Sequence, residues 1–379
     1  MLLFRSLLLC TFTALIIVCV PDFRPGLALA EDKKPAAEEG FKPLFNGKNL
    51  DGWVNVNCHP DTFFVKGDEI ITTGTPTGFL RTDKQYENFV LEMDWMHVNK
   101  TEVGNSGLFV WGDPLPGVGT PYTRGIEVQI LVNLEYKDKK TGAITATSHG
   151  DVFSIHGAKC VPDRPHPTGG QRCLPNENRA KGGGEWNHYK VSANDGIIKL
   201  EVNGKEVSGV SKCNPRKGYL ALESEGAECH FKNIKIKELP TTNPKPEECA
   251  KVAEGHVSLF NGIDLKGWTT KVGEWKSGGG AINAAVNATA DLTTEGKFGA
   301  CELVFDWRLP TSQAKAEWVV TVGGQKTTIK LPADAKADTW QRQTVKVERA
   351  TDTAPITFSP VPGGLQIMNV FVRELKEKK

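Results

Sequence analysis

The chain has 379 residues, with 46 basic and 45 acidic side chains and a formal net charge of +1 at pH 7. This length is sufficient for two domains of ordinary size. The near-neutral balance argues against nucleic acid as a partner, because phosphate binding requires a net basic surface or stripe.

Residues 1–30 have the pattern of a secretory signal peptide. A basic start at Arg5 precedes an apolar run over residues 7–20, and residues 28–30 (ALA) form a small-x-small cleavage signal. The apolar run is too short for a comfortable membrane span, although an uncleaved anchor is the alternative. We therefore expect an exported protein, periplasmic or extracellular. No later segment is apolar enough to cross a bilayer, so no membrane span is expected.

Two polar segments divide the rest of the chain. Residues 31–40 are expected to form one linker, and residues 241–255, rich in proline and charge, a second. This predicts one domain over residues 41–240 and another over residues 256–379.

The sequence between the linkers is typical of β-strands. Short apolar alternations are separated by Gly, Asn, Asp and Pro, and Asn203-Gly204 is an explicit hairpin turn. No long amphipathic helix is evident. An all-β fold is predicted, with two packed sheets. The expected strands of the first domain are 63–65, 89–96, 106–111, 126–131, 189–191, 197–202, 219–222 and 231–236.

One ten-residue phrase occurs twice, as LFNGKNLDGW at 44–53 and LFNGIDLKGW at 259–268, with seven identical positions. The phrase LEMDW at 91–95 is matched by LVFDW at 303–307. These matches predict that the second domain is a shortened copy of the first β-sandwich. Most of the loss is expected after the DW strand, where it would remove the strands around 105–111 and 124–131 and the loop 145–184.

Six phrases follow one another along the chain: LFNGKNLDGW from Leu44, GNSGLFV from Gly104, GIEVQIL from Gly125, GEWNHYKV from Gly184, VNGKEV from Val202 and FKNIKIKEL from Phe231. Together they resemble the 3-keto-disaccharide hydrolase domain family. The resemblance covers residues 41–240 well and residues 256–379 weakly. It implies a concanavalin A-like jelly roll and a sugar or glycoside as ligand.

The resemblance also implies a chemistry. A general base removes the C2 proton of a 3-keto glycoside, the C1 oxygen leaves by elimination, and water adds to the enone. For part of the family it implies a divalent metal ion, which would hold the ketone and stabilise the enolate. The chain has no dinucleotide-binding fingerprint, so a separate oxidoreductase is expected to supply the 3-keto substrate.

The strand at 126–130 (IEVQI) alternates strictly. Its three aliphatic residues are expected to face the core, so Glu127 and Gln129 share the opposite face. Glu127 is predicted to be the catalytic base or a metal ligand, and Gln129 to hold sugar hydroxyls. The alternative is a solvated polar face.

Four further residues are candidates for substrate binding. Asn105 is placed to bond a hydroxyl or to close a turn, and Trp111 to stack on a sugar ring or to fill the core. Arg124 and Arg172 are candidate clamps for hydroxyls or anions.

The segment 148–179 contains three of the eight histidines of the chain, at positions 149, 156 and 166. His149 and Asp151 are predicted to form an oxygen and nitrogen metal site with Glu127. Alternatively, His149 or His156 is the base that takes the C2 proton. Hydrogen bonding within the loop is the competing explanation, and spacing alone does not decide between them.

Export favours disulfides among the seven cysteines outside the signal peptide, and we expect Cys160 to pair with Cys173 and Cys213 with Cys229. The leading prediction is thus an exported hydrolase or lyase acting on 3-keto glycosides. A non-catalytic carbohydrate-binding module is the alternative, because fold alone does not decide function.

Overall fold

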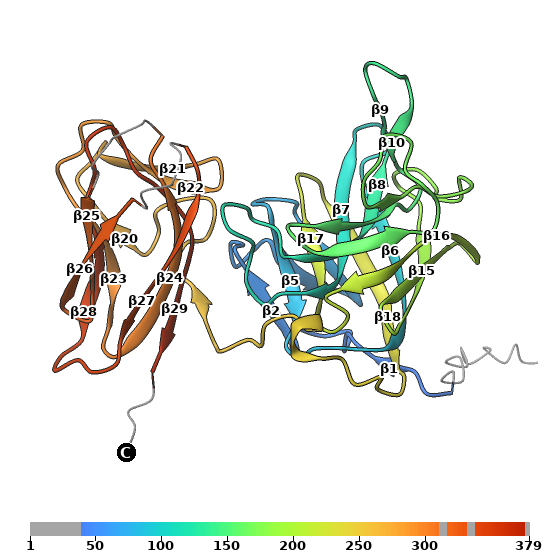
Figure 1. The fold of residues 1–379 in the computed structure, drawn as a ribbon, viewed down its shortest axis with the longest axis horizontal. Helices are drawn as coiled ribbons and strands as arrows, with labels where there is room; N and C mark the ends of the chain where they lie inside the picture. Colours follow the sequence, from blue (N-terminus) through green and yellow to red (C-terminus); the bar gives the residue numbers. More distant parts are fainter. Residues whose placement is uncertain (1–38, 311–316, 332–337, 376–379) are drawn as a thin grey trace, which may run out of the picture. The chain divides into compact units, whose positions relative to one another are not determined.

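Nearly every regular segment of the molecule is a β-strand (Figure 1). The computed structural model describes residues 39–310, 317–331 and 338–375, and residues 40–379 form one compact unit. The expected signal peptide and most of the first linker lie outside these residues. Within them, the one helical element is the short 3-10 turn η1 (Pro246–Glu248), and no helix has the length and hydropathy needed to cross a membrane.

The first sandwich contains a nine-stranded antiparallel sheet with the order β12-β16-β15-β14-β6-β18-β4-β3, in which β1 also pairs with β18. Its strands are β1 (Lys42–Pro43), β3 (Phe63–Lys66), β4 (Glu69–Thr72), β6 (Phe89–His97), β12 (Lys159–Pro162), β14 (Asn187–Asn194), β15 (Ile197–Val202), β16 (Lys205–Asn214) and β18 (Cys229–Glu238).

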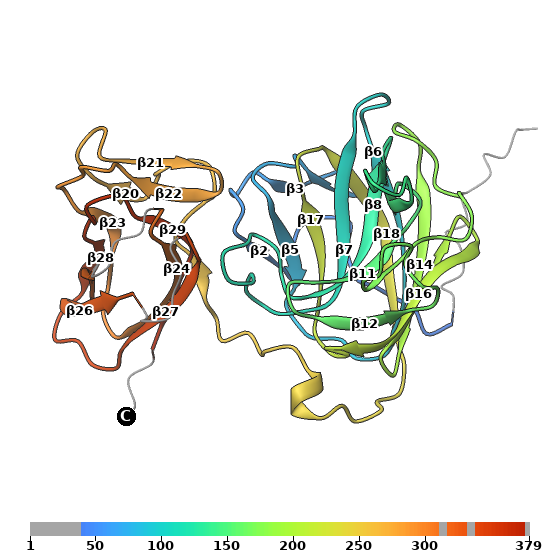
Figure 2. The ribbon, with the colours of Figure 1, turned by 45° about the horizontal axis from the view of Figure 1, so that its top comes forward.

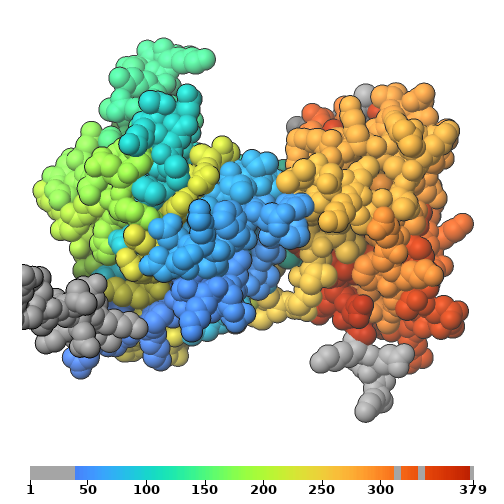
Figure 3. All heavy atoms as spheres, turned by 180° about the vertical axis from the view of Figure 1, so that it is seen from behind, coloured from blue at the N-terminus to red at the C-terminus, as the bar shows by residue number. Residues whose placement is uncertain are grey.

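The second sheet of this sandwich has the order β13-β11-β8-β7-β17-β5-β2. In Figure 2, β2, β5, β17, β7 and β8 follow one another across this layer. Its strands are β2 (Trp53–Val56), β5 (Gly78–Thr82), β7 (Gly104–Gly112), β8 (Gly125–Val132), β11 (Val152–Ile155), β13 (Arg172–Cys173) and β17 (Tyr219–Ser224). A separate hairpin of β9 (Glu135–Lys137) and β10 (Ile144–Thr147) projects from the sandwich (Figure 3).

The core between the two sheets follows from strand alternation. In β6, every second residue from Phe89 to Trp95 is buried, and the residues between them are partly exposed. In β8, Ile126, Val128 and Ile130 are fully buried and belong to this core, as predicted. Because side chains alternate along a strand, Glu127 and Gln129 lie on the opposite face of the sheet.

The second sandwich has two antiparallel sheets, with the orders β21-β22-β29-β24-β27 and β20-β23-β28-β25-β26, and β19 pairs with β29. The strands are β19 (Val257–Ser258), β20 (Trp268–Thr269), β21 (Trp275–Gly278), β22 (Ala281–Ala284), β23 (Leu292–Phe298), β24 (Cys301–Arg308), β25 (Glu317–Val322), β26 (Gln325–Lys330), β27 (Gln341–Val347), β28 (Ala354–Phe358) and β29 (Gln366–Glu374). The protein is therefore all-β, with two sandwich-like pairs of sheets.

The strand orders correct one prediction about the shorter sandwich. Strands β25 and β26 occupy the same places in their sheet as β7 and β8 in the first sandwich, so these strands are not lost. The second sandwich instead lacks counterparts of β9 to β13, β15 and β16 in its described residues. In addition, the β7–β8 connection, residues 113–124, corresponds to a turn at Gly323-Gly324.

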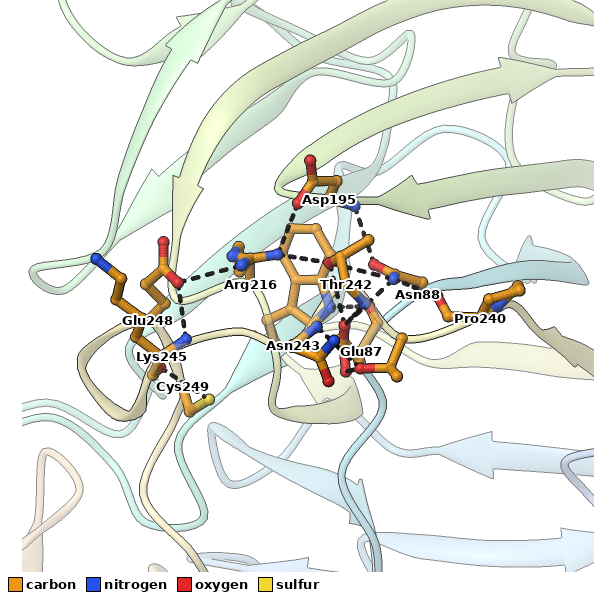
Figure 4. A network of polar contacts seen from close by, with 12 residues as sticks. Glu87, Asn88, Asp195, Arg216, Pro240, Thr242, Asn243, Lys245, Glu248 and Cys249 are labelled. Carbon is orange, nitrogen blue, oxygen red and sulfur yellow. Dashed lines mark hydrogen bonds and ion pairs between the residues drawn. The ribbon is translucent and has the colours of Figure 1, made fainter.

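The segment after β18 is fixed to the first sandwich, although its composition predicted a linker (Figure 4). The Arg216 guanidinium donates to Thr242 Oγ1 at 2.7 Å and to Glu248 Oε2 at 3.1 Å. Asn88 Nδ2 donates to the Pro240 carbonyl at 2.7 Å. Charge and proline content here therefore do not produce a detached tether.

All seven described cysteines are free thiols. The predicted pairs Cys160–Cys173 and Cys213–Cys229 are therefore wrong. Cys229 is fully buried in β18 and Cys213 lies in β16, and these strands are not neighbours in their sheet.

Candidate functional site

A band of residues runs across the outer face of the sheet that contains β8. Successive strands pair Arg172 with Phe153, Phe153 with Glu127, and Glu127 with Phe109. The same row continues through Ala221 to Arg81. Since directly paired residues point to the same face, these side chains line one continuous surface.

The neighbouring row contains Gln129, Gly107, Glu223 and Phe79, with Gly107 opposite Gln129 and Glu223 opposite Phe79. A Cβ on Gly107 would lie 2.9 Å from Glu223 Oε2 and 3.1 Å from Glu127 Oε1. These two distances place the two carboxyl oxygens at most 6.0 Å apart. The absence of a side chain at Gly107 therefore creates the space over which Glu127 and Glu223 meet.

A third carboxyl, that of Glu225, lies immediately after β17. It accepts hydrogen bonds from Tyr122 Oη at 2.6 Å and from Asn105 Nδ2 at 2.5 Å. Asn105 Oδ1 in turn accepts from Gln129 Nε2 at 2.9 Å. We call the group Glu127, Glu223 and Glu225 the acidic cluster.

Burial changes the protonation of this cluster. Glu127 is 7% exposed, and burial together with the charge of Glu225 raises its pKa from 4.5 to about 8. Glu223 is 1% exposed, its carboxyl shares a hydrogen bond with that of Glu225, and burial together with the charge of Glu127 raises its pKa well above 4.5. This rise favours the protonated form of Glu223, whose hydroxyl can donate a hydrogen bond.

Glu225 differs from its two neighbours because it is partly exposed and its oxygens accept hydrogen bonds. Burial raises its pKa, while the Tyr122 hydroxyl opposes this rise. Burial and the Glu225 carboxyl raise the pKa of Tyr122, so this phenol remains protonated. The cluster thus combines three carboxyls of raised pKa with a protonated phenol within one small region.

His156 lies next to this region. Its ring stacks on that of Tyr122, with 5.4 Å between the centroids and 11° between the planes, and it contacts Thr120 Oγ1 at 3.4 Å. Burial lowers the His156 pKa, which favours a neutral imidazole able to accept a proton.

The two predicted arginine clamps are already engaged. Arg172 forms an ion pair with Asp151 at 2.7 Å, and its guanidinium lies 3.5 Å from the centroid of the Phe153 ring. Arg124 donates two hydrogen bonds to Asp113, at 2.8 and 3.0 Å. Arg172 lies in the same cross-strand row as Glu127, on the edge strand β13. It is therefore at the border of the sheet face that carries the acidic cluster, which we call the acidic face.

Trp111 does not line the site, so the prediction that it stacks on a sugar is wrong. It is fully buried in the core of the first sandwich, and its indole Nε1 donates to the Glu87 carbonyl at 2.8 Å. The polar end of the ring is satisfied inside the protein, which is a core role.

The predicted metal site is not assembled. The Asp151 carboxylate accepts from Thr147 and Arg172, so its oxygens are already occupied. His149 is partly buried, and its backbone N–H donates to Thr147 Oγ1. In the described part of the chain, His149, Asp151 and Glu127 do not form a group with ligand spacing.

A different trio meets that spacing. The ligand atoms of Glu254, His256 and Glu302 all lie within 4.8 Å of one another. However, the Arg373 guanidinium already bonds Glu254 at 2.8 Å and Glu302 at 3.1 Å. This trio could bind a cation by its atom types, but it is separate from the acidic cluster, and the single Arg373 guanidinium already offsets part of its charge.

A cavity of about 660 Å³ adjoins the acidic face without including the three carboxyls in its lining. Arg81, Arg124 and His156 line it from the first sandwich, and Val304 and Arg342 from the second. The acidic cluster, rather than this cavity, is the candidate chemical centre. Most of the basic side chains that line the cavity are already engaged in hydrogen bonds or ion pairs.

Three residues of this site were missed from sequence. Glu223 and Glu225 continue the alternation of Leu220 and Leu222, a signal that becomes visible when the strand is extended beyond Leu222. Tyr122 lies in a loop without periodicity, so no pattern indicates it.

In the second sandwich, the row that corresponds to that of Glu127 contains threonines and a lysine. The pairing there joins Thr269 to Thr293, Thr293 to Thr357, and Thr357 to Thr321. Lys326 follows Thr321 on β26. The acidic cluster is thus a property of the first sandwich.

These features define a jelly-roll sandwich with a buried acidic cluster on the outer face of one sheet. Residues 40–237 and 255–327 match the family described as the 3-keto-alpha-glucoside-1,2-lyase-like domain, and the chain belongs to this family. The fold is concanavalin A-like, as predicted, and the family is that of a carbohydrate-active or carbohydrate-binding protein.

Several solved structures are similar to part of the chain. A candidate glycosyl hydrolase from Parabacteroides distasonis is 23% identical, with 53% of this chain and 95% of that chain covered and a TM-score of 0.40. A carbohydrate-binding module from Bacillus subtilis is 14% identical, with 49% and 96% covered and a TM-score of 0.35. A beta-glucanase from Bacillus licheniformis is 15% identical, with 53% and 97% covered and a TM-score of 0.33. No curated protein matches the chain.

Proposed function

We propose that the first sandwich cleaves 3-keto glycosides by elimination followed by addition of water. Family membership supports the substrate class. The observation that carries the proposal is the pair of buried carboxyls over Gly107, one with its pKa raised to about 8 and the other with its pKa raised well above 4.5. Proton abstraction next to a ketone requires this combination of a base and a hydrogen-bond donor.

In this proposal, ionised Glu127 removes the C2 proton, and the electron pair moves toward the C3 carbonyl. The protonated Glu223 carboxyl donates a hydrogen bond to the C3 oxygen and stabilises the enolate charge. In the site without ligand this carboxyl shares a hydrogen bond with Glu225, so the ligand would compete with Glu225 for its proton.

The C1–O bond then breaks, and the leaving oxygen receives a proton from an acid of the site. Tyr122 is the candidate, because its phenol remains protonated. Water adds its oxygen to C1 of the enone and a proton returns to C2. One water is consumed, and the free 3-keto sugar and the released alcohol are formed.

No step of this scheme requires a metal ion. The family resemblance implies a metal for some members, but the residues predicted to hold one do not converge. Glu223 provides the electrophilic contact instead. Oxidation of the sugar at C3 is assigned to a separate oxidoreductase, and the proposed compartment is the periplasm or the exterior of the cell.

The test is to incubate the purified protein with a 3-keto disaccharide and to follow release of the free 3-keto sugar. Activity should rise with pH up to about 8, as Glu127 ionises. Glu127→Gln should abolish turnover, whereas Glu206→Gln, an exposed change on β16, should not. Turnover that survives Glu127→Gln would refute the assigned base.

The second candidate is sugar binding without cleavage. It is favoured by the amide pair of Asn105 and Gln129 beside Glu225, since amides and carboxylates are suitable partners for hydroxyls. Saturable binding of a sugar by a protein that turns over none of several 3-keto disaccharides would select this alternative.

A further inference from the structure

The loop between β7 and β8 connects the acidic cluster to the second sandwich. Residues 113–124 leave the sheet, return to it, and carry Tyr122 to its hydrogen bond with Glu225. The counterpart in the second sandwich is only the turn at Gly323-Gly324. This loop is therefore a structural addition of the sandwich that has the acidic cluster.

Three residues of the second sandwich hold this loop, and we call Asp306, Arg342 and Asn369 the loop clamp. Asp306 is fully buried, and it accepts from Arg342 Nε at 2.7 Å and from Asn369 Nδ2 at 2.6 Å. It also accepts from Arg342 Nη2 and from the backbone N–H of Gly119, each at 2.9 Å.

The other two members bind carbonyls of the same loop. Arg342 Nη2 donates to the Pro116 carbonyl at 2.9 Å, and Asn369 Nδ2 donates to the Thr120 carbonyl at 2.9 Å. The Gly117 carbonyl accepts from both residues as well, so the clamp bonds four backbone groups within five consecutive residues, and Tyr122 follows two positions later. Charged partners make such bonds stronger and more directional than neutral ones.

Steric fit adds to the polar contacts. Gly119 has a positive φ of 69°, and a Cβ there would overlap the indole of Trp340. Phe371 of β29 packs in one apolar cluster with Phe79 and Phe109 of the acidic-face sheet. The loop therefore has one permitted path between the two sandwiches.

The first sandwich contains a triad with the same polar arrangement, but this triad does not hold a loop of the other sandwich. Asp94 accepts from His188 at 2.7 Å and from Asn233 at 2.7 Å, on the strands that correspond to β24, β27 and β29. Asn233 and Asn369 both have positive φ, of 53° and 51°. This triad provides a matched control, because it is built in the same way but makes no hydrogen bond to the described residues of the loop that carries Tyr122.

We infer that Asp306, Arg342 and Asn369 are positioning residues that fix Tyr122 against Glu225, so the second sandwich is a working part of the site. This inference rests on the proposed function for its kinetic test. It assigns to the second sandwich a role that its own threonine-lined face cannot supply.

The kinetic test compares Arg342→Ala, Gly119→Ala and Tyr122→Phe in the full chain. Gly119→Ala displaces the loop without altering the fold of the second sandwich. Each variant should lower kcat by about 10–100-fold with a smaller change in KM, since misplacement by about 1 Å can cost that much. Adding Tyr122→Phe to either clamp variant should cause little further loss, because both changes remove the same contribution.

Two controls separate positioning from general stability. Arg342→Lys should restore part of the activity, and His188→Ala with Asn233→Ala should leave kcat within about twofold. Fully multiplicative losses in the double variants, or equal losses in the control triad, would overturn the inference.

A second measurement does not depend on turnover. Amide hydrogen exchange of residues 117–122 should accelerate at least tenfold in Arg342→Ala and Gly119→Ala, and not in His188→Ala. If the wild type shows no turnover but this exchange pattern is found, the proposed function fails and the positioning inference stands. Unchanged exchange in both clamp variants would refute the positioning itself.

Discussion

Replacing Glu127 by glutamine should change how stability depends on pH. In the folded protein, burial and the charge of Glu225 raise the Glu127 pKa from 4.5 to about 8. Between these values the folded state keeps a proton that the unfolded state has lost. The free energy of unfolding therefore falls as pH rises through this window, and the stabilisation is fully lost above the folded pKa.

The expected size follows from the same values. One pKa unit corresponds to about 1.4 kcal/mol, so ionisation linkage at Glu127 costs about 3 kcal/mol by pH 7 and about 5 kcal/mol above pH 8. Glutamine has the shape of the protonated carboxyl and cannot ionise. Glu127→Gln should thus match the wild type near pH 5 and exceed its stability increasingly toward pH 9.

The assay is the urea midpoint of each protein at pH 5, 7 and 9, with Glu206→Gln as the exposed control. The difference between Glu127→Gln and wild type is the quantity of interest, because Glu223 also contributes to the slope. A difference that stays constant from pH 5 to pH 9 would show that Glu127 does not hold a proton in the folded state. The base assigned to the proposed reaction would then lack its raised pKa.

Three further substitutions test other parts of the site. Gly107→Ala places a methyl group 2.9 Å from Glu223 Oε2, so turnover should fall at least tenfold while the free energy of unfolding changes by less than about 1 kcal/mol, measured by kinetics and urea titration. Asp151→Asn leaves the half-buried Arg172 without its charged partner and should cost about 2–3 kcal/mol of stability, measured by urea unfolding. Trp111→Phe should cost about 1–3 kcal/mol with an unchanged KM; a raised KM would revive the sugar-stacking hypothesis.

Periodicity explains why part of the site could be predicted. Glu127 and Gln129 alternate with aliphatic residues over a complete strand, so their face follows from the sequence. Glu223 obeys the same rule, but the apolar alternation predicts a strand that ends at Leu222, whereas β17 continues to Ser224. Register between distant strands, which places Gly107 between Glu127 and Glu223, is not encoded in any local window.

Predictions that relied on proximity along the chain were less successful. His149 and Asp151 are two residues apart, yet Asp151 is occupied by Thr147 and Arg172 and no metal group forms with Glu127. Conversely, Tyr122 meets Glu225 across 103 positions. In a sandwich, neighbours in space are set by the sheet order, so sequence spacing indicates little beyond a single strand or hairpin.

The way in which the second sandwich is shortened bears on why only one site exists. In the first sandwich, β11 and β13 extend one sheet beyond β8, and β15, β16 and β12 extend the other beyond β14. The described second sandwich ends at the counterparts of β8 and β14, so both sheets lose the same side. That side carries Phe153 and Arg172, which continue the row beyond Glu127.

A buried carboxyl at the counterpart of Glu127 would therefore lie on an edge strand. It would be open to water on one side and would not acquire a raised pKa by burial. Loss of the flanking strands removes the conditions for an acidic cluster while leaving the central core intact. In the described part of the shortened sandwich, no further strand covers β27, and the loop clamp lies on β27 and the adjacent strands β24 and β29. This arrangement is consistent with a sandwich that supports a neighbouring site rather than forming its own.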